Sequence, residues 1–398
     1  MSFHLSHPVD FSAHNAEVER VWKAYEERRP YRVPVRFSAS ITNLLCNPEL
    51  NEKGWTFRQF FEDPQVQIDA RLAFDNWWVR NVVGDHRMGP PEEGWQTWVD
   101  FQNSYEAGWF GCPLKYCEGV VPDTEPILRE RKEKLYDLEP PDPLRGGLLG
   151  RAMELFERMH ELCPRMEFQG LPVLPPCGLP GEITDGVFTV ACLLRGTTEF
   201  CMDIMEDPGY AHDLMRFVTE NTIRRIRAIQ QWRWERLPDS PDAGQVNRPN
   251  WGFADDGIVV LSVPQYREFV LPYHRQLAAE FSDGTPLGMH LCGDASRFFP
   301  VMHEELGVGT FNTGFPMPFA EMRRRLGPDV AIEGGVPVPL LKSGPPGAIR
   351  EEVKRICGSG VMAGGRFVMV EACNMSPGTP VEHVEAMYEA CKQYGRYQ

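Results

Sequence analysis

The stretch Pro286-Leu-Gly-Met-His-Leu-Cys292 is a short apolar run typical of a buried strand, and a helix is expected after it at 295–306. The same order of strand and helix then follows three more times. Strands are expected at 308–313, 329–334 and 366–371, and helices at 319–326, 347–358 and 381–394. Successive strand–helix units indicate a parallel sheet, because a parallel connection needs a crossover of helical length. Continued over the whole chain, this pattern predicts an α/β fold, a closed (β/α)8 TIM barrel.

The N-terminal half follows the same alternation less regularly. Expected helices lie at 15–29, 56–78, 148–163, 187–194, 210–235 and 263–281, and expected strands at 31–40, 167–176 and 250–257. A turn is expected at 180–186, where the sequence is Pro-Gly-Glu-Ile-Thr-Asp-Gly. Residues 83–147 show no sustained period and are too irregular to bury a core of their own. We therefore expect one domain spanning 1–398, with 83–147 as an inserted lid or hairpin.

Charge and cysteine usage restrict the class of protein. With 41 basic and 56 acidic side chains the net charge is -15, which disfavours a nucleic-acid groove or an anionic membrane surface as partner. The 11 cysteines are odd in number, and the N-terminal residues lack the pattern of a signal peptide. Reduced thiols and a cytoplasmic location are therefore expected. No apolar run approaches the ~20 residues that span a bilayer.

A possible metal site lies in the opening stretch. In a strand His290 and Cys292 project from the same face, and imidazole and thiolate are ligands that zinc prefers. Cys373 lies at the end of the expected strand 366–371 and supplies a third ligand. Three protein ligands with one position open are typical of catalytic zinc. The alternative is that these are ordinary core residues, since buried cysteine is common and a core imidazole needs only a hydrogen-bond partner.

Other polar residues also fall at expected strand ends, where barrels carry their functional groups. They are Asp255, Asp256, Asn312, Glu333 and Glu371. In contrast, His274, His303 and His383 lie within expected helices and are interpreted as surface or capping residues.

Three segments resemble the uroporphyrinogen decarboxylase superfamily. They are Asp255-Asp-Gly257 with 261–273, Glu333-Gly-Gly-Val-Pro337 with Leu340 and Leu341, and 373–390, which begins Cys-Asn-Met-Ser-Pro-Gly-Thr-Pro. The resemblance is strong from Asn250 to the C-terminus and faint before it. Within the superfamily, the zinc-dependent, corrinoid-linked methyltransferases carry a His-x-Cys pair and a distant Cys. His290, Cys292 and Cys373 occupy those positions.

This resemblance implies a zinc-dependent transfer of a methyl group between methylcobalamin and a small substrate. No corrinoid-binding motif is visible in this chain, so the cobalamin is expected on a separate corrinoid protein. A decarboxylase-like lyase is one alternative, although Val33-Pro-Val-Arg-Phe-Ser-Ala39 replaces the Arg-Gln-Ala-Gly-Arg stretch of the decarboxylases. A non-catalytic corrinoid- or tetrapyrrole-binding protein is the other. The methyl donor and acceptor, the direction of transfer and the oligomeric state stay open.

The acidic residues have more than one interpretation. Glu371 or Glu333 could fill the open metal position until substrate displaces it, because Glu371 and Cys373 share a face of a regular strand. Either could equally orient the metal ligands through hydrogen bonds. Asp255 and Asp256 are candidates for substrate contact, for proton transfer, or for a structural hydrogen-bonded pair.

Overall fold

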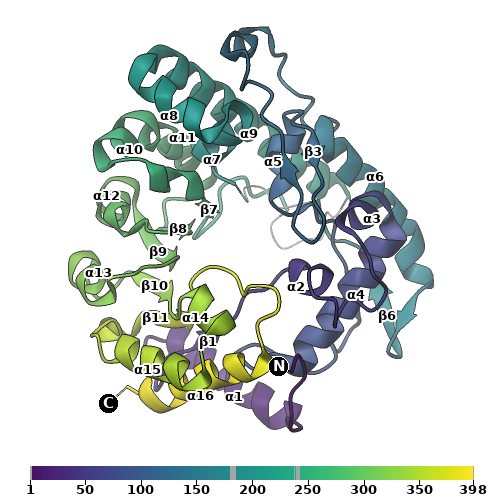
Figure 1. The fold of residues 1–398 in the computed structure, drawn as a ribbon, viewed down its shortest axis with the longest axis vertical. Coiled ribbons are helices and arrows are strands. Elements are labelled where there is room, and N and C mark those ends of the chain that lie inside the picture. The colour runs from purple at the N-terminus through teal and green to yellow at the C-terminus, as the bar shows by residue number, and fades with distance from the viewer. Residues whose placement is uncertain (1, 180–184, 237, 239–242, 398) are drawn as a thin grey trace.

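The computed structural model describes residues 2–179, 185–236, 238 and 243–397 (Figure 1). Its largest sheet has six strands in the order β1-β11-β10-β9-β8-β7, and all five pairings are parallel. The strands are β1 (Val35–Arg36), β7 (Gly252–Ala254), β8 (Leu287–Leu291), β9 (Val308–Thr313), β10 (Ala331–Gly334) and β11 (Phe367–Val370). The predicted α/β class and the parallel C-terminal strands are confirmed.

Helices follow these strands and lie on their outer side (Figure 1). The C-terminal helices are α12 (Phe299–Val301), α13 (Phe319–Leu326), α14 (Val338–Ser343), α15 (Pro346–Cys357) and α16 (Val381–Tyr394). A π-helical turn at Met302–Leu306 extends α12. The four strand–helix units predicted after residue 286 are thus present in order, with α14 as an additional short helix.

The N-terminal half contains two smaller sheets. The first has the order β2-β6-β5, formed by β2 (Trp95–Gln96), β6 (Leu171–Leu174) and β5 (Glu167–Phe168), with β2 and β6 parallel. The second is an antiparallel pair, β3 (Leu114–Lys115) and β4 (Asp123–Thr124), inside the predicted insertion. Because β2 also lies within 83–147 but pairs with β6, this segment is part of the main fold as well. In the described residues the six-stranded sheet does not close by hydrogen bonds into a barrel.

The remaining helices are more numerous than predicted. They are α1 (Phe11–Glu26), α2 (Thr42–Leu45), α3 (Phe57–Glu62), α4 (Pro64–Asn81), α5 (Tyr105–Trp109), α6 (Gly147–Leu162), α7 (Val187–Arg195), α8 (Thr197–Glu206), α9 (Pro208–Arg236), α10 (Val263–Phe269) and α11 (Leu271–Phe281). The single helix expected at 56–78 is divided because the Asp63 side chain caps α4, which begins at Pro64. The helix expected at 263–281 is divided at Val270. None of the helices in the described chain combines the length and apolar character of a membrane-spanning segment.

Side-chain burial along the sheet explains where polar groups can gather. All four residues of β11 are buried, as expected for a parallel strand covered on both faces. In β8, Leu287, Met289 and Leu291 are buried, whereas Gly288 and His290 are only partly so. The alternation turns His290 away from the apolar layer and toward an internal cavity.

Candidate metal centre

His290, Cys292 and Cys373 meet at the carboxyl ends of β8 and β11. One potential ligand atom from each lies within 4.8 Å of the others, and all three side chains are partly buried. His290 Nε2 is 3.2 Å from Cys292 Sγ. Cys373 has a φ of 102°, a conformation that is rare for residues other than glycine and that turns the chain just beyond β11. Residues 81 positions apart in sequence therefore share one site.

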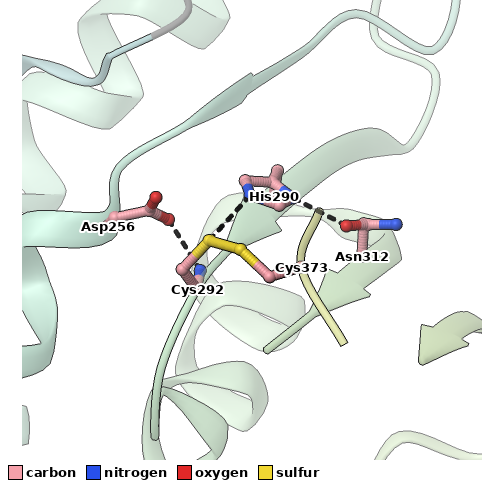
Figure 2. Close-up of a disulfide and its surroundings, with 5 residues drawn as sticks. All are labelled: Asp256, His290, Cys292, Asn312 and Cys373. Carbon is pink, nitrogen blue, oxygen red and sulfur yellow. Dashed lines mark hydrogen bonds between the residues drawn. A yellow bond between two sulfur atoms is a disulfide. The ribbon is translucent and has the colours of Figure 1, made fainter. Parts of the chain in front are cut away.

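Figure 2 shows the sulfur atoms of Cys292 and Cys373 joined in a disulfide, with a Cα–Cα distance of 5.8 Å. A metal ion would need both residues as thiolates, because the thiolate is the ligand form of cysteine. The disulfide and a metal-bound form are thus alternative states of the same pair. One imidazole and two sulfur atoms within this distance fit a zinc ion that keeps a fourth position open.

A chain of hydrogen bonds orients the imidazole. His290 Nδ1 is 2.6 Å from Asn312 Oδ1 (Figure 2). The Asn312 amide donates to Glu333 Oε2 at 2.9 Å. Glu333 is in turn ion-paired with Arg36. Because the Asn312 amide nitrogen is committed to Glu333, its oxygen faces His290, and Nδ1 must carry the proton. The lone pair of Nε2 is then available to a metal.

Asp256 holds the backbone beside the site. Its Oδ1 accepts a hydrogen bond of 2.6 Å from the Cys292 amide. Burial raises the pKa of this carboxyl above its usual range, although the Cys292 amide and His290 act in the opposite direction. Asp256 therefore fixes the position of Cys292 and also lines the cavity next to it.

Glu371 does not join the metal-ligand group that the structure forms. Its Oε1 accepts a hydrogen bond of 2.6 Å from the Ser38 amide, and burial raises its pKa to about 8. The expectation that Glu371 and Cys373 share a face assumed a regular strand, but β11 ends at Val370 and the backbone turns at Cys373. Likewise, Glu333 reaches His290 only through Asn312.

Asp255 is fully buried and anchors a helix. Its carboxylate accepts hydrogen bonds from the amides of Phe188 and Thr189 at 3.0 and 2.8 Å, at the N-terminus of α7, and from the Thr189 hydroxyl at 2.7 Å. His274 Nε2 lies 2.9 Å from Asp255 Oδ2. This arrangement favours the structural interpretation of Asp255, because the carboxylate takes the place of an N-cap side chain that Gly186 lacks.

Two histidines are less exposed than predicted. The interpretation of His274 as a surface or capping residue is wrong, because the side chain is completely buried and is paired with Asp255 and with the Tyr266 hydroxyl. His383 is also buried, with Nδ1 2.7 Å from the Leu341 carbonyl. Helical periodicity did not reveal these partners, which come from other parts of the chain.

The three candidate ligand residues open onto a cavity of about 500 Å³. Besides the ligands, its polar lining consists of Asn103, Asp185, Asp256, Thr310, Asn312 and Asn374. Sequence reasoning missed Asp185, which it placed only in the turn expected at 180–186; residues 180–184 of that turn lie outside the described chain. Burial, together with Glu106 and Asp256, raises the pKa of Asp185 to about 8. No local pattern marked this residue, because the acidic groups around it come from distant segments.

Comparison with known proteins agrees with this geometry. Residues 252–394 match the uroporphyrinogen decarboxylase (URO-D) family. The match covers the C-terminal part of the chain. The matched residues contain strands β7 to β11 and all three members of the candidate ligand group. The superfamily expected from the sequence is thus confirmed.

Relatives in this family include both methyltransferases and decarboxylases. The methylated-thiol–coenzyme M methyltransferase of Methanosarcina mazei is 28% identical over 297 residues, covering 74% of this chain and 71% of the relative. The uroporphyrinogen decarboxylase of Dechloromonas aromatica is 23% identical over 292 residues, covering 72% and 75%. That of Rhodococcus jostii is 30% identical over 150 residues, 38% of each chain.

A solved structure shares the fold. A methyltransferase from Methanosarcina mazei superposes with a TM-score of 0.62 at 17% sequence identity, covering 95% of this chain and 98% of that chain. The agreement therefore includes the N-terminal half, where the URO-D family match does not extend.

Proposed function

We propose that this chain is a zinc-dependent methyltransferase that moves a methyl group between a corrinoid protein and a small substrate. The observation that carries the proposal is the meeting of His290, Cys292 and Cys373 in one group beside a cavity. The similarity over 74% of the chain to a methylated-thiol–coenzyme M methyltransferase supports the same reaction class.

The proposed zinc would be held by His290 Nε2 and the two cysteine sulfurs. A bound zinc supplies a Lewis acid that lowers the pKa of a coordinated thiol, or polarises a methylated heteroatom, at its open position. Asn312 keeps His290 in the tautomer that can bind, and Asp256 fixes the Cys292 backbone. The substrate would occupy the adjoining cavity, where the reacting atom can lie within bonding distance of the ligand group.

The cobalamin would arrive on a separate corrinoid protein. We extend the proposal to a single domain of (β/α)8 type working in the cytoplasm, with the segment 83–147 helping to shape the cavity through Asn103. Support for the barrel comes from the strand order β1-β11-β10-β9-β8-β7 and from the parallel pair β2 and β6.

The proposal is tested by metal analysis and a transfer assay on the reduced protein. We expect about one zinc per chain, and demethylation of free methylcobalamin in the presence of a small thiol, followed by the change in its visible spectrum. Cys292→Ser should lose both, while Cys177→Ser, at an exposed free cysteine, should lose neither. A reduced wild-type protein that binds no zinc, or a Cys292→Ser variant that transfers methyl groups at the wild-type rate, would contradict the proposal.

A further inference from the structure

The cavity beside the candidate metal centre carries acidic groups on its wall. Asp256 reaches it from the segment after β7, and Asp185 from the segment before α7. Figure 2 shows Asp256 directly beside Cys292. The other polar lining groups are uncharged amides and a hydroxyl, apart from the ligands themselves.

Asp185 presents an unused acceptor. Its Oδ2 is buried and has no hydrogen-bond partner among the residues that the structure describes, although its backbone amide donates to Glu106 Oε1 at 3.3 Å. The neighbouring Gly186 packs tightly, since a Cβ there would lie 2.3 Å from the Asp255 carboxyl carbon. The segment is therefore fixed by its neighbours, while one carboxylate oxygen is left for another group. A buried carboxylate oxygen without a partner is costly, and a ligand that donates to it recovers that cost.

Among the described residues, no lysine or arginine side chain lines the cavity. The undescribed positions 1, 180–184, 237, 239–242 and 398 include no lysine or arginine, so every such residue of the chain lies in the described part. Two arginines lie near the cavity lining, and each is already close to a glutamate. Arg36 is ion-paired with Glu333, and Arg225 lies 3.7 Å from Glu106. An anionic substrate would thus find two acidic side chains and no lysine or arginine in the cavity.

We propose that Asp185 selects substrates whose non-reacting end is cationic, such as an ammonium group, and that the cavity disfavours substrates with an anionic end. The proposal rests on the proposed methyl transfer for the role of the reacting end. It assigns to Asp185 a specificity-determining contact, in which the ammonium donates to Oδ2 while the opposite end points to His290, Cys292 and Cys373. Asp256 adds negative charge to the same cavity.

The test uses three two-carbon thiols that differ only in the charge of the other end: cysteamine, 2-mercaptoethanol and 2-mercaptoethanesulfonate. Their affinities for the reduced, zinc-loaded protein are measured by calorimetry at pH 9, where Asp185, with its pKa raised to about 8, is ionised. We expect cysteamine to bind tightest and the sulfonate weakest, with about a tenfold or larger difference between them, as expected for one partly buried charge pair. Asp185→Asn should reduce this ratio by about tenfold, and Asp185→Glu should keep it. Asp294→Asn makes the same charge change at an exposed position and should leave the ratio unaltered.

The outcomes separate this inference from the proposed function. Equal or tighter binding of the sulfonate, a ratio unaffected by Asp185→Asn in a protein with wild-type circular dichroism, or no binding of any thiol would overturn the inference. If Asp185→Asn does not fold, the order of affinities for the wild-type protein decides alone. Methylcobalamin demethylation is followed in parallel. A preference for cysteamine without methyl transfer would support the role of Asp185 and contradict the proposed function. Methyl transfer with a preference for the sulfonate would support the proposed function and contradict the role of Asp185.

Discussion

The Nδ1 atom of His290 lies 2.6 Å from Oδ1 of Asn312, and this contact determines which imidazole nitrogen can face a metal. The Asn312 amide donates to Glu333, which is ion-paired with Arg36. Four residues, on β8, β9, β10 and β1 of the same sheet, thereby fix one proton. Hydrogen-bond partners of this kind orient a metal ligand, and their loss typically lowers metal affinity by about 10- to 100-fold.

Asn312→Ala should weaken zinc binding by about 10- to 100-fold, because His290 loses the acceptor that holds its ring and tautomer. The dissociation constant is measured by competition with a chromophoric chelator. Asn247→Ala is the matched control, since Asn247 donates to the carbonyls of Glu280 and Ser282 and does not line the cavity as the structure describes it. Unchanged affinity in Asn312→Ala would show that the hydrogen-bond chain does not orient the ligand.

Metal and disulfide should exclude each other. Nine cysteines are free and two are joined in the structure. The folded, metal-free protein is treated with a mild oxidant and then unfolded, and its reactive thiols are counted. We expect nine thiols after oxidation and all 11 after treatment with a reducing phosphine. Zinc bound before oxidation should protect both Cys292 and Cys373, because coordinated thiolates are not free to form the disulfide.

Thiol counting in denaturant and metal analysis check this expectation. The Cys373→Ser variant serves as control, since its oxidised and reduced forms should differ in neither thiol count nor zinc content. Full zinc binding by the oxidised wild-type protein would contradict the exclusion of one state by the other.

Asp255→Ala should destabilise the fold by about 3–5 kcal/mol, because it removes the cap of α7 and leaves His274 Nε2 without its partner in the core. Urea unfolding of the metal-free reduced protein measures the loss. Asp10→Ala removes an exposed cap from α1 and should cost only about 1 kcal/mol. Equal losses in the two variants would contradict the anchoring role of Asp255.

His86 should make stability fall in mild acid. Burial lowers its pKa from 6.5 to about 4, so the unfolded chain takes up a proton in this range that the folded chain does not. The free energy of unfolding should consequently decrease as the pH falls from 6.5 to 4, by about 3 kcal/mol from this residue. Above pH 6.5 the contribution is constant.

Urea unfolding at several pH values measures this slope in wild-type protein and in His86→Phe. The ring centroids of His86 and Trp78 are 5.1 Å apart, and a phenylalanine ring at position 86 can keep this stacking. His7→Phe, at an exposed histidine, should keep the wild-type slope. An identical slope in His86→Phe would contradict the assignment.

Periodicity was sufficient for the C-terminal half of the fold. Strand β9 and helices α13 and α16 have the predicted bounds, because each is a continuous apolar or amphipathic segment between clear turn residues. The helices near 63 and 270 were predicted less well. There a cap or a following proline divides a segment whose apolar pattern continues across the break.

By itself the sequence determined the parallel α/β class, through local patterns of side chains, and the superfamily, through a resemblance. It also predicted that His290, Cys292 and Cys373 form a ligand group, and the structure brings these three residues together. Only the tertiary structure decided the roles of the acidic residues. Asp255 anchors α7, Glu371 lies outside the candidate ligand group, and Asp185 lines the cavity. The physical reason is that the environment of a carboxylate is set by burial and by partners from distant segments, which the spacing along one strand does not contain.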